Sequence, residues 1–165
     1  MKKVCLINGS LRGKKASSLA FLKRVSAALG TNGFQIHLLT VKPGANGLEA
    51  LTAAASADVI VIAFPLFCYT LPGALTRFLE DLHSYAEKNG QCNGHGKVFA
   101  IVNCGFPEPR INEEAIRVMR SFCARLGLRS DARYRSRREY HGIRSSVFED
   151  RQGRHGHLYR QGPGS

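Results

Sequence analysis

The seven-residue run DVIVIAF at positions 58–64 constrains the fold of this chain more than any other stretch. Its β-branched and apolar side chains follow one another without the polar alternation of a strand that has one face in water. Parallel strands that are covered by helices on both faces have this composition. The run therefore predicts a buried strand at the middle of a parallel sheet.

Weaker strand signals and helical patterns surround this run and alternate along the chain. The predicted elements are strands at residues 4–7, 34–41, 58–64 and 97–103, and helices at residues 17–29, 48–57, 73–88 and 111–126. Strands that alternate with helices are typical of an α/β fold with a doubly wound parallel sheet, in which helices cover both faces and make three layers.

This pattern ends near residue 128. Residues 129–165 hold nine arginines, no lysine and four acidic residues, and their apolar side chains are isolated. We therefore predict one domain at residues 1–128 and an irregular, disordered Arg-rich tail at 129–165, with the final edge strand of the sheet missing or replaced. A shifted reading frame in GC-rich coding DNA is an alternative origin for such a tail.

Composition excludes several classes of protein. A chain of 165 residues with 44% hydrophobic content has material for a single core. The sequence has neither an apolar run of about 18 residues nor a signal-peptide pattern, so we predict no contact with membranes. Five cysteines without a CxxC pair argue against a disulfide framework and against a metal site. A reducing, cytoplasmic location is predicted.

Three loops that follow predicted strands have an unusual composition. Residues 8–18 (NGSLRGKKASS) combine hydroxyls and cations before a helix start, residues 65–73 (PLFCYTLPG) are apolar and aromatic, and residues 103–108 (NCGFPE) are rich in small and rigid residues. In a doubly wound sheet the loops after the first, third and fourth strands meet at the carboxyl edge, where the strand order reverses. We expect the three loops to share one ligand.

The first loop suits a phosphate monoester, because hydroxyls, backbone amides and a guanidinium all donate hydrogen bonds at a helix N-terminus. The second loop suits a flat aromatic ring. Each loop alone also has an ordinary explanation: a turn with serine caps, a buried loop packed on another subunit, or a rigid turn before a helix. Together they predict a pocket with a phosphate end and a planar end.

Three segments, NGSLRGKKASS, ADVIVIAFPLFCYTLPGALTRFLEDL and AIVNCGFPE, resemble the NAD(P)H-dependent FMN reductase family, which has the flavodoxin-like fold. The resemblance covers residues 1–128 and implies bound FMN and a homodimer. The residues that it places on FMN are Ser10, Arg12, Ser17 and Ser18 at the phosphate, Pro65, Leu66, Phe67, Cys68 and Leu71 along the isoalloxazine, and Asn103, Cys104, Gly105 and Phe106 at the other edge of the ring.

The function that we predict is an FMN-dependent oxidoreductase that takes hydride from NAD(P)H through flavin N5 and reduces a small acceptor, such as a quinone, a flavin or a nitroaromatic. Flavin chemistry resides in the cofactor, so no catalytic side chain is predicted. A net charge of +12 leaves an alternative open, a non-enzymatic binding protein whose basic tail contacts nucleic acid or another polyanion. Deletion of residues 129–165 distinguishes the two hypotheses, because a polyanion-binding tail predicts that this binding is lost while flavin uptake stays intact.

Overall fold

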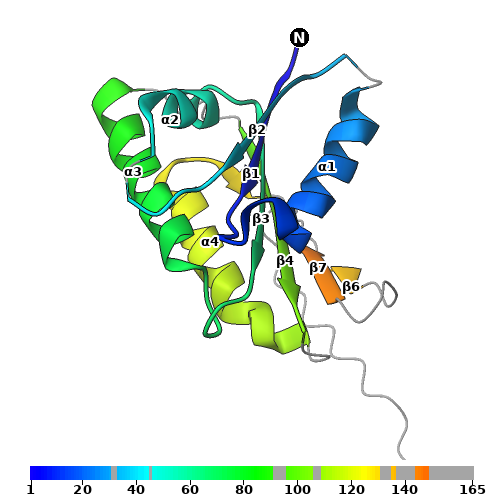
Figure 1. Cartoon of the computed structure of the whole chain (residues 1–165). Helices are drawn as coiled ribbons and strands as arrows, with labels where there is room; N and C mark the ends of the chain where they lie inside the picture. The colour runs from blue at the N-terminus through cyan, green and yellow to red at the C-terminus, as the bar shows by residue number, and fades with distance from the viewer. Residues whose placement is uncertain are drawn as a thin grey trace, which may run out of the picture.

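The computed structural model describes residues 1–30, 33–44, 46–90, 96–105, 109–130, 135–136 and 144–148 (Figure 1). The strands are β1 (Lys3–Asn8), β2 (Gln35–Thr40), β3 (Val59–Pro65), β4 (Lys97–Cys104), β5 (Arg129–Ser130), β6 (Arg135–Ser136) and β7 (Arg144–Phe148). The helices are α1 (Ser17–Gly30), α2 (Leu48–Ala55), α3 (Gly73–Asn89) and α4 (Glu113–Arg125), with short 3-10 helices η1 (Gly13–Lys15) and η2 (Pro109–Asn112). The four strands and four helices that were predicted before residue 128 all form.

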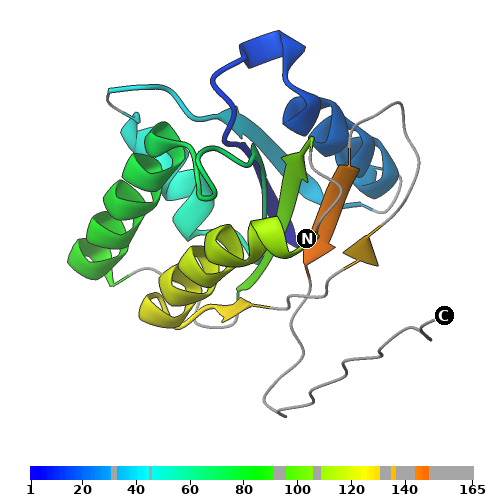
Figure 2. The same ribbon diagram turned by 90° about the horizontal axis from the view of Figure 1, so that it is seen from below.

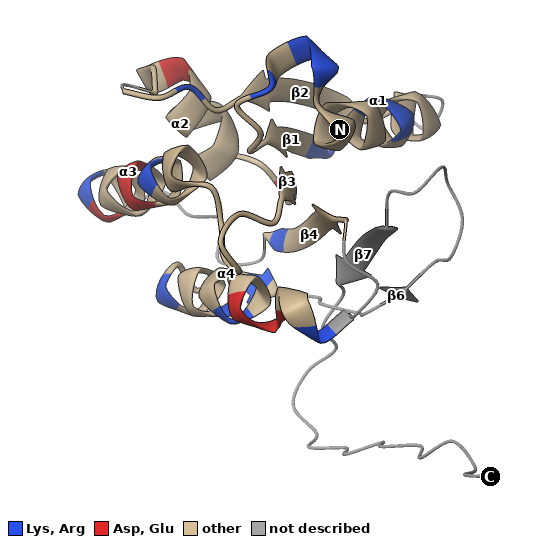
Figure 3. Cartoon of the chain, turned by 60° about the horizontal axis from the view of Figure 1, so that its bottom comes forward, with Lys and Arg blue, Asp and Glu red and all other residues tan. Residues whose placement is uncertain are grey.

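The sheet has the order β2-β1-β3-β4, and these four strands are parallel. Helix α1 covers one face, whereas α2, α3 and α4 cover the other (Figure 3). Strand β2 lies on one side of β1 and β3 lies on the other, so the strand order reverses between β1 and β3. This arrangement confirms the predicted doubly wound, flavodoxin-like α/β fold.

Strand β3 lies between β1 and β4 and is buried on both faces, as its sequence predicted. Val61 and Ala63 belong to the core cluster on the α1 side, together with Leu22 of α1. Ile62 and Phe64 belong to the larger cluster beneath α2, α3 and α4. Successive side chains of a strand point to opposite faces, so an uninterrupted apolar run is what a strand between two helical layers requires.

Residues after 128 form the edge of the sheet beside β4, where the sequence predicts that the final edge strand is missing or replaced. Strand β5 pairs in parallel with β4 at Lys97 and Val98. Strand β7 pairs antiparallel with the rest of β4, from Ala100 to Cys104, and β6 pairs antiparallel with β7. The predicted edge strand is thus replaced rather than missing. Sequence periodicity missed these strands because pairing at an edge uses backbone hydrogen bonds and needs no long apolar run.

The predicted disorder of the tail falls largely on residues that the structure does not describe, including 149–165. The domain boundary at residue 128 and the shifted reading frame also stay predictions.

The four cysteines that the structure describes are all free thiols. Burial raises the pKa of Cys5 and of Cys123 from 9.0 to about 12, because a thiolate loses its hydration in the core. Both thiols therefore stay protonated at neutral pH and act as small apolar core residues. Cys68 is exposed, and Cys104 is half-buried. None of the described helices is long and apolar enough to cross a membrane.

Candidate functional site at the carboxyl edge of the sheet

The first predicted loop leaves β1 at Asn8 and passes through η1 before α1 begins at Ser17. It starts tightly against the neighbouring strand, because the Gly9 amide donates to the carbonyl of Ala63 at 2.8 Å. Ser10 is buried, and its hydroxyl oxygen accepts a hydrogen bond from the Arg12 amide at 3.3 Å. The Arg12 side chain is exposed. The loop is thus anchored at its start and presents its guanidinium to solvent.

A buried asparagine joins both ends of this loop. The Asn8 side chain is 0% exposed, and its Oδ1 accepts hydrogen bonds from the Ser10 amide at 3.2 Å and from the Ser18 hydroxyl at 2.7 Å. Its Nδ2 donates to Thr40 Oγ1 at the end of β2, at 3.3 Å. One amide group therefore links β1, β2, the loop and the first turn of α1.

The second loop contains a two-residue hairpin between Phe67 and Thr70. The amide of each of these residues donates to the carbonyl of the other at 2.9 Å. Cys68 and Tyr69, at the two central positions, have φ of +47° and +63°. A turn of this type normally carries Asn or Gly, because other side chains strain the backbone at positive φ. The strained turn holds two aromatic side chains in solvent, with Phe67 62% exposed and Tyr69 64% exposed.

The third loop begins at the end of β4 and lies beside the second. Pro65 and Asn103 are register partners, and the Leu66 amide donates to the Asn103 carbonyl at 2.9 Å. The side-chain Oδ1 of Asn103 is buried and has no hydrogen-bond partner among the residues that the structure describes. Buried polar atoms are nearly always paired, so this oxygen can accept a further hydrogen bond.

The three loops therefore meet at one edge of the sheet. The hydrogen bond from Gly9 joins the first loop to the end of β3, and the hydrogen bond from Leu66 joins the second loop to the end of β4. Seen from below in Figure 2, η1, the loop that precedes α3 and the end of β4 surround the same end of the sheet. The predicted meeting of the loops is confirmed at the level of the backbone.

Residues 2–122 match the family of NADPH-dependent FMN reductases. The chain belongs to this family. The match covers β1 to most of α4, and with them all three loops of the carboxyl edge. Membership makes the chain an FMN reductase-like oxidoreductase and favours the enzymatic hypothesis over the polyanion-binding alternative, which rests on tail residues that lie largely outside the described ranges.

Solved structures of similar shape have the same fold at low sequence identity. FerB from Paracoccus denitrificans, a flavoenzyme NAD(P)H:(acceptor) oxidoreductase, is 17% identical, with 79% of this chain and 75% of that chain covered and a TM-score of 0.61. An azoreductase from Bacillus anthracis is 16% identical, with 79% and 86% covered and a TM-score of 0.59. A Fusobacterium nucleatum flavodoxin bound to flavin mononucleotide is 14% identical, with 86% and 75% covered and a TM-score of 0.58. A comparison with curated proteins gave no match.

Not every residue predicted to bind FMN in this family member presents its side chain at the edge. Leu71 is only 3% exposed and belongs to the main core cluster, and the Ser18 hydroxyl donates to Asn8. Ser17 is half-buried at the start of α1, and Gly105 is exposed beyond β4. Phe106 lies outside the described residues. The roles of these residues toward FMN stay predictions.

Sequence reasoning overlooked Asn8, although the sequence carries a signal for it. An asparagine closes an otherwise apolar strand, at the last position before the glycine that starts the loop. A buried polar side chain at the carboxyl end of a parallel strand must find partners, and here the loop and α1 supply them.

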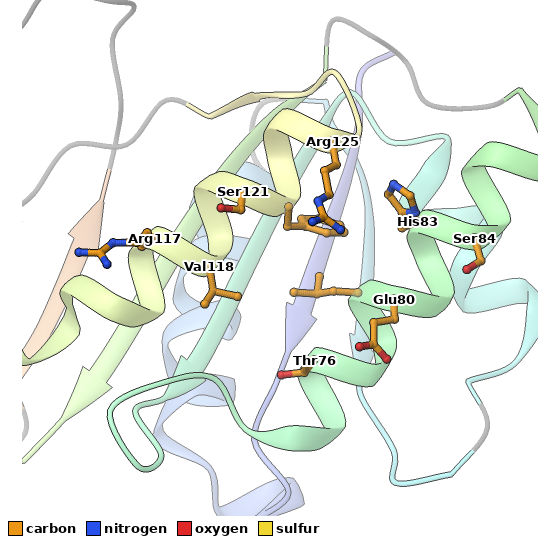
Figure 4. A pocket seen from close by; sticks show the side chains of 10 residues that line it. Thr76, Glu80, His83, Ser84, Arg117, Val118, Ser121 and Arg125 are labelled. Carbon is orange, nitrogen blue, oxygen red and sulfur yellow. The ribbon is translucent and has the colours of Figure 1, made fainter.

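A groove of about 490 Å³ lies away from this edge, between α3 and α4. Its lining includes the apolar side chains of Leu79, Val118 and Phe122, but none of the residues predicted to bind FMN. Figure 4 shows Glu80 and His83 on the α3 side and Arg117 and Arg125 on the α4 side. The groove thus has an apolar floor between charged rims.

Proposed function

We propose that the chain is an FMN-dependent oxidoreductase that takes hydride from NADH or NADPH and reduces a small acceptor, such as a quinone, a free flavin or a nitroaromatic. The observation that carries the proposal is the meeting of three loops at the carboxyl edge of the sheet, within a chain of the FMN reductase family. Family membership supports FMN directly, whereas the acceptor and the choice of nicotinamide are inferred from the chemistry of flavins.

The residues at the edge fit FMN at both of its ends. Ser10, Arg12 and Ser17 lie in the loop before α1 and at its first residue, and the backbone amides and dipole of a helix start favour a phosphate. At the other end, the Oδ1 of Asn103, which has no hydrogen-bond partner among the described residues, suits a ring N–H, which isoalloxazine carries. The exposed ring of Phe67 lies on the intervening hairpin and suits contact with a flat heterocycle.

The protein's own contribution is binding, orientation and exclusion of water. When bound, FMN supplies a ring that accepts hydride from a nicotinamide and passes electrons to an acceptor. Two hydrogen bonds between Phe67 and Thr70 close the aromatic hairpin. The hydrogen bond from the Leu66 amide to the Asn103 carbonyl then fixes the hairpin next to the end of β4. No side chain is required as a general acid or base, and Cys68 and Cys104 are not assigned a nucleophilic role.

Purified protein is expected to bind FMN and turn yellow, and its flavin absorbance should bleach anaerobically with NADH or NADPH and return when a quinone is added. Arg12→Ala should weaken FMN binding about tenfold or more, because a guanidinium bond to an anion is lost, while riboflavin affinity changes little. Fluorescence titration with both flavins measures this difference.

Lys23→Ala, which removes an exposed cation from α1 outside the loop, is the matched control and should leave FMN affinity unchanged. A wild-type protein that takes up no FMN contradicts the proposed function. Equal losses for FMN and riboflavin in Arg12→Ala would instead show that the phosphate lies elsewhere.

We further propose that two copies of the chain associate through the groove between α3 and α4. Its floor exposes Val118, which is 39% exposed, and its rims carry opposite charges, with Glu80 on α3 and Arg117 and Arg125 on α4. Glu80 also pairs with Arg77 at 3.8 Å and Arg117 with Glu114 at 3.3 Å, and each of these exposed pairs lies within one helix. In a two-fold contact, α3 of one copy meets α4 of the other, so each acidic rim faces a basic one. The apolar floor supplies the area to bury.

Val118→Glu is expected to convert the dimer to a monomer in sedimentation velocity, because it places a charge in the apolar floor of the contact. Leu38→Glu is the matched control, since Leu38 is similarly exposed, at 43%, but lies on the edge strand β2. A wild-type monomer at micromolar concentration, or a Val118→Glu dimer, would contradict the groove as the contact.

A cytoplasmic location, proposed from the free thiols and the need for NAD(P)H, is checked by cell fractionation.

A further inference from the structure

We propose that Asn8 is a positioning residue for the anion-binding loop, and that Ser18 acts on the phosphate through Asn8 rather than by touching it. The inference rests on the proposed function, because the anion is taken to be the FMN phosphate. It changes the role of Ser18, which the sequence predicts as a direct phosphate donor.

The hydrogen bonds of Asn8 determine whether the Ser18 hydroxyl is free to donate to the anion. Its Oδ1 accepts from the Ser10 amide at 3.2 Å and from the Ser18 hydroxyl at 2.7 Å, so both lone pairs of the oxygen are used. A serine hydroxyl has one hydrogen, and that of Ser18 is donated inside the protein, at a side chain with 0% exposure. Ser18 consequently has no proton left for a phosphate at the surface.

Asn8 is itself held firmly on its other side. Its Nδ2 donates to Thr40 Oγ1 at 3.3 Å, and its carbonyl accepts from the Val41 amide at 3.0 Å. Asn8 is also a register partner of Ala63 in β3. The Asn8 side chain is therefore held in place by the sheet. Its hydrogen bonds with Ser10 and Ser18 in turn restrain the loop and the first turn of α1.

The consequence concerns the loop backbone. The Ser10 amide is tied to Asn8, and the Ser10 hydroxyl oxygen in turn accepts from the Arg12 amide at 3.3 Å. This chain of bonds sets the path of residues 8–12 before any anion arrives. A loop whose path is already set binds an anion more tightly, because less ordering entropy is lost on binding. Without Asn8, the loop would have to order itself around the phosphate.

The test compares FMN with riboflavin in Asn8→Ala, Ser18→Ala and the double variant. Each single variant should lose about tenfold in FMN affinity with riboflavin affinity unchanged, since only the phosphate end is loosened. The double variant should lose no more than Asn8→Ala alone, because both changes remove the same bond. If Ser18 bound the phosphate itself, the two losses would multiply and the proposal would be overturned.

Ser26→Ala, another serine of α1, is the matched control and should leave both affinities unchanged. Ser18→Ala removes one of the two bonds to Asn8 and provides the milder variant if Asn8→Ala folds poorly. Parallel losses for FMN and riboflavin would assign Asn8 to the fold in general and overturn the positioning role.

Amide hydrogen exchange separates this inference from the proposed function. In Asn8→Ala, the Ser10 and Arg12 amides should exchange faster, while the amides of β4 keep their rates, whether or not any flavin is bound. If wild-type protein takes up no FMN, the proposed function fails, and the exchange rates alone then test whether Asn8 positions the loop. Unchanged exchange at Ser10 and Arg12 would then overturn the positioning role.

Discussion

Replacing Phe78 with alanine is expected to lower the free energy of unfolding by about 3–5 kcal/mol, the largest stability effect among the substitutions considered. Phe78 lies on α3, is 0% exposed and belongs to the main core cluster between the sheet and helices α2, α3 and α4. Truncation to alanine loses the buried ring and leaves a cavity that the surrounding side chains fill only in part. Urea denaturation monitored by circular dichroism measures the change.

Phe67→Ala is the control, because it deletes the same ring from a side chain that is 62% exposed. Its free energy of unfolding should stay within about 0.5 kcal/mol of wild type. The effects on flavin affinity should be reversed. Phe67→Ala should weaken the binding of riboflavin and of FMN, whereas Phe78→Ala should bind both flavins normally under conditions in which it is folded. Similar stability losses in the two variants would contradict the core position of Phe78.

Gly9→Ala is expected to destabilise the fold by about 1–3 kcal/mol and to displace the start of the anion-binding loop. A Cβ at Gly9 would lie 2.8 Å from Leu75 Cδ2 and 2.9 Å from Phe64 Cβ. Both neighbours are 0% exposed, and a Cβ that close to the rigid part of Phe64 forces the backbone to move. The hydrogen bond from the Gly9 amide to Ala63 should weaken with it.

Gly73→Ala adds the same methyl group at the start of α3, where its Cβ would meet no atom within 4 Å from the rest of the described chain, apart from its sequence neighbours and the helix's own backbone. Its stability should match or slightly exceed that of wild type, since alanine favours helix over glycine. Thermal unfolding and FMN titration of the two variants compare a crowded with an open position. Equal stability of Gly9→Ala and Gly73→Ala would show that the loop absorbs the added methyl group at no cost.

Much of the fold was predictable from local patterns. The apolar run of β3, the helical spacing in α1 and α3 and the glycine at position 127, which takes φ of +64°, each encode a local structure that the tertiary fold retains. Those patterns are short-range, because side-chain periodicity follows directly from the geometry of a strand or a helix. The rules for parallel connections then restrict the possible strand orders to a few.

The edge strands after α4 could not be predicted in the same way. Strand β7 pairs with β4 in the antiparallel sense, and the paired residues lie 40 to 48 positions apart in the chain, from Cys104 with Arg144 to Ala100 with Phe148. Local composition does not encode which strand a short polar segment joins. Its place in the sheet depends on backbone groups of β4 that only the folded sheet presents.

The candidate site, like the fold, was predictable only in part. By itself, the sequence determined that hydroxyls, a cation and aromatic side chains follow three strands whose ends must meet, because parallel strands present their carboxyl ends at one edge. Only the tertiary structure decided that the Ser18 hydroxyl turns inward to Asn8, that Asn8 reaches Thr40, and that Leu71 joins the core. Those choices depend on which buried polar groups come within hydrogen-bonding distance, and residues 32 positions apart acquire that proximity only when the sheet forms.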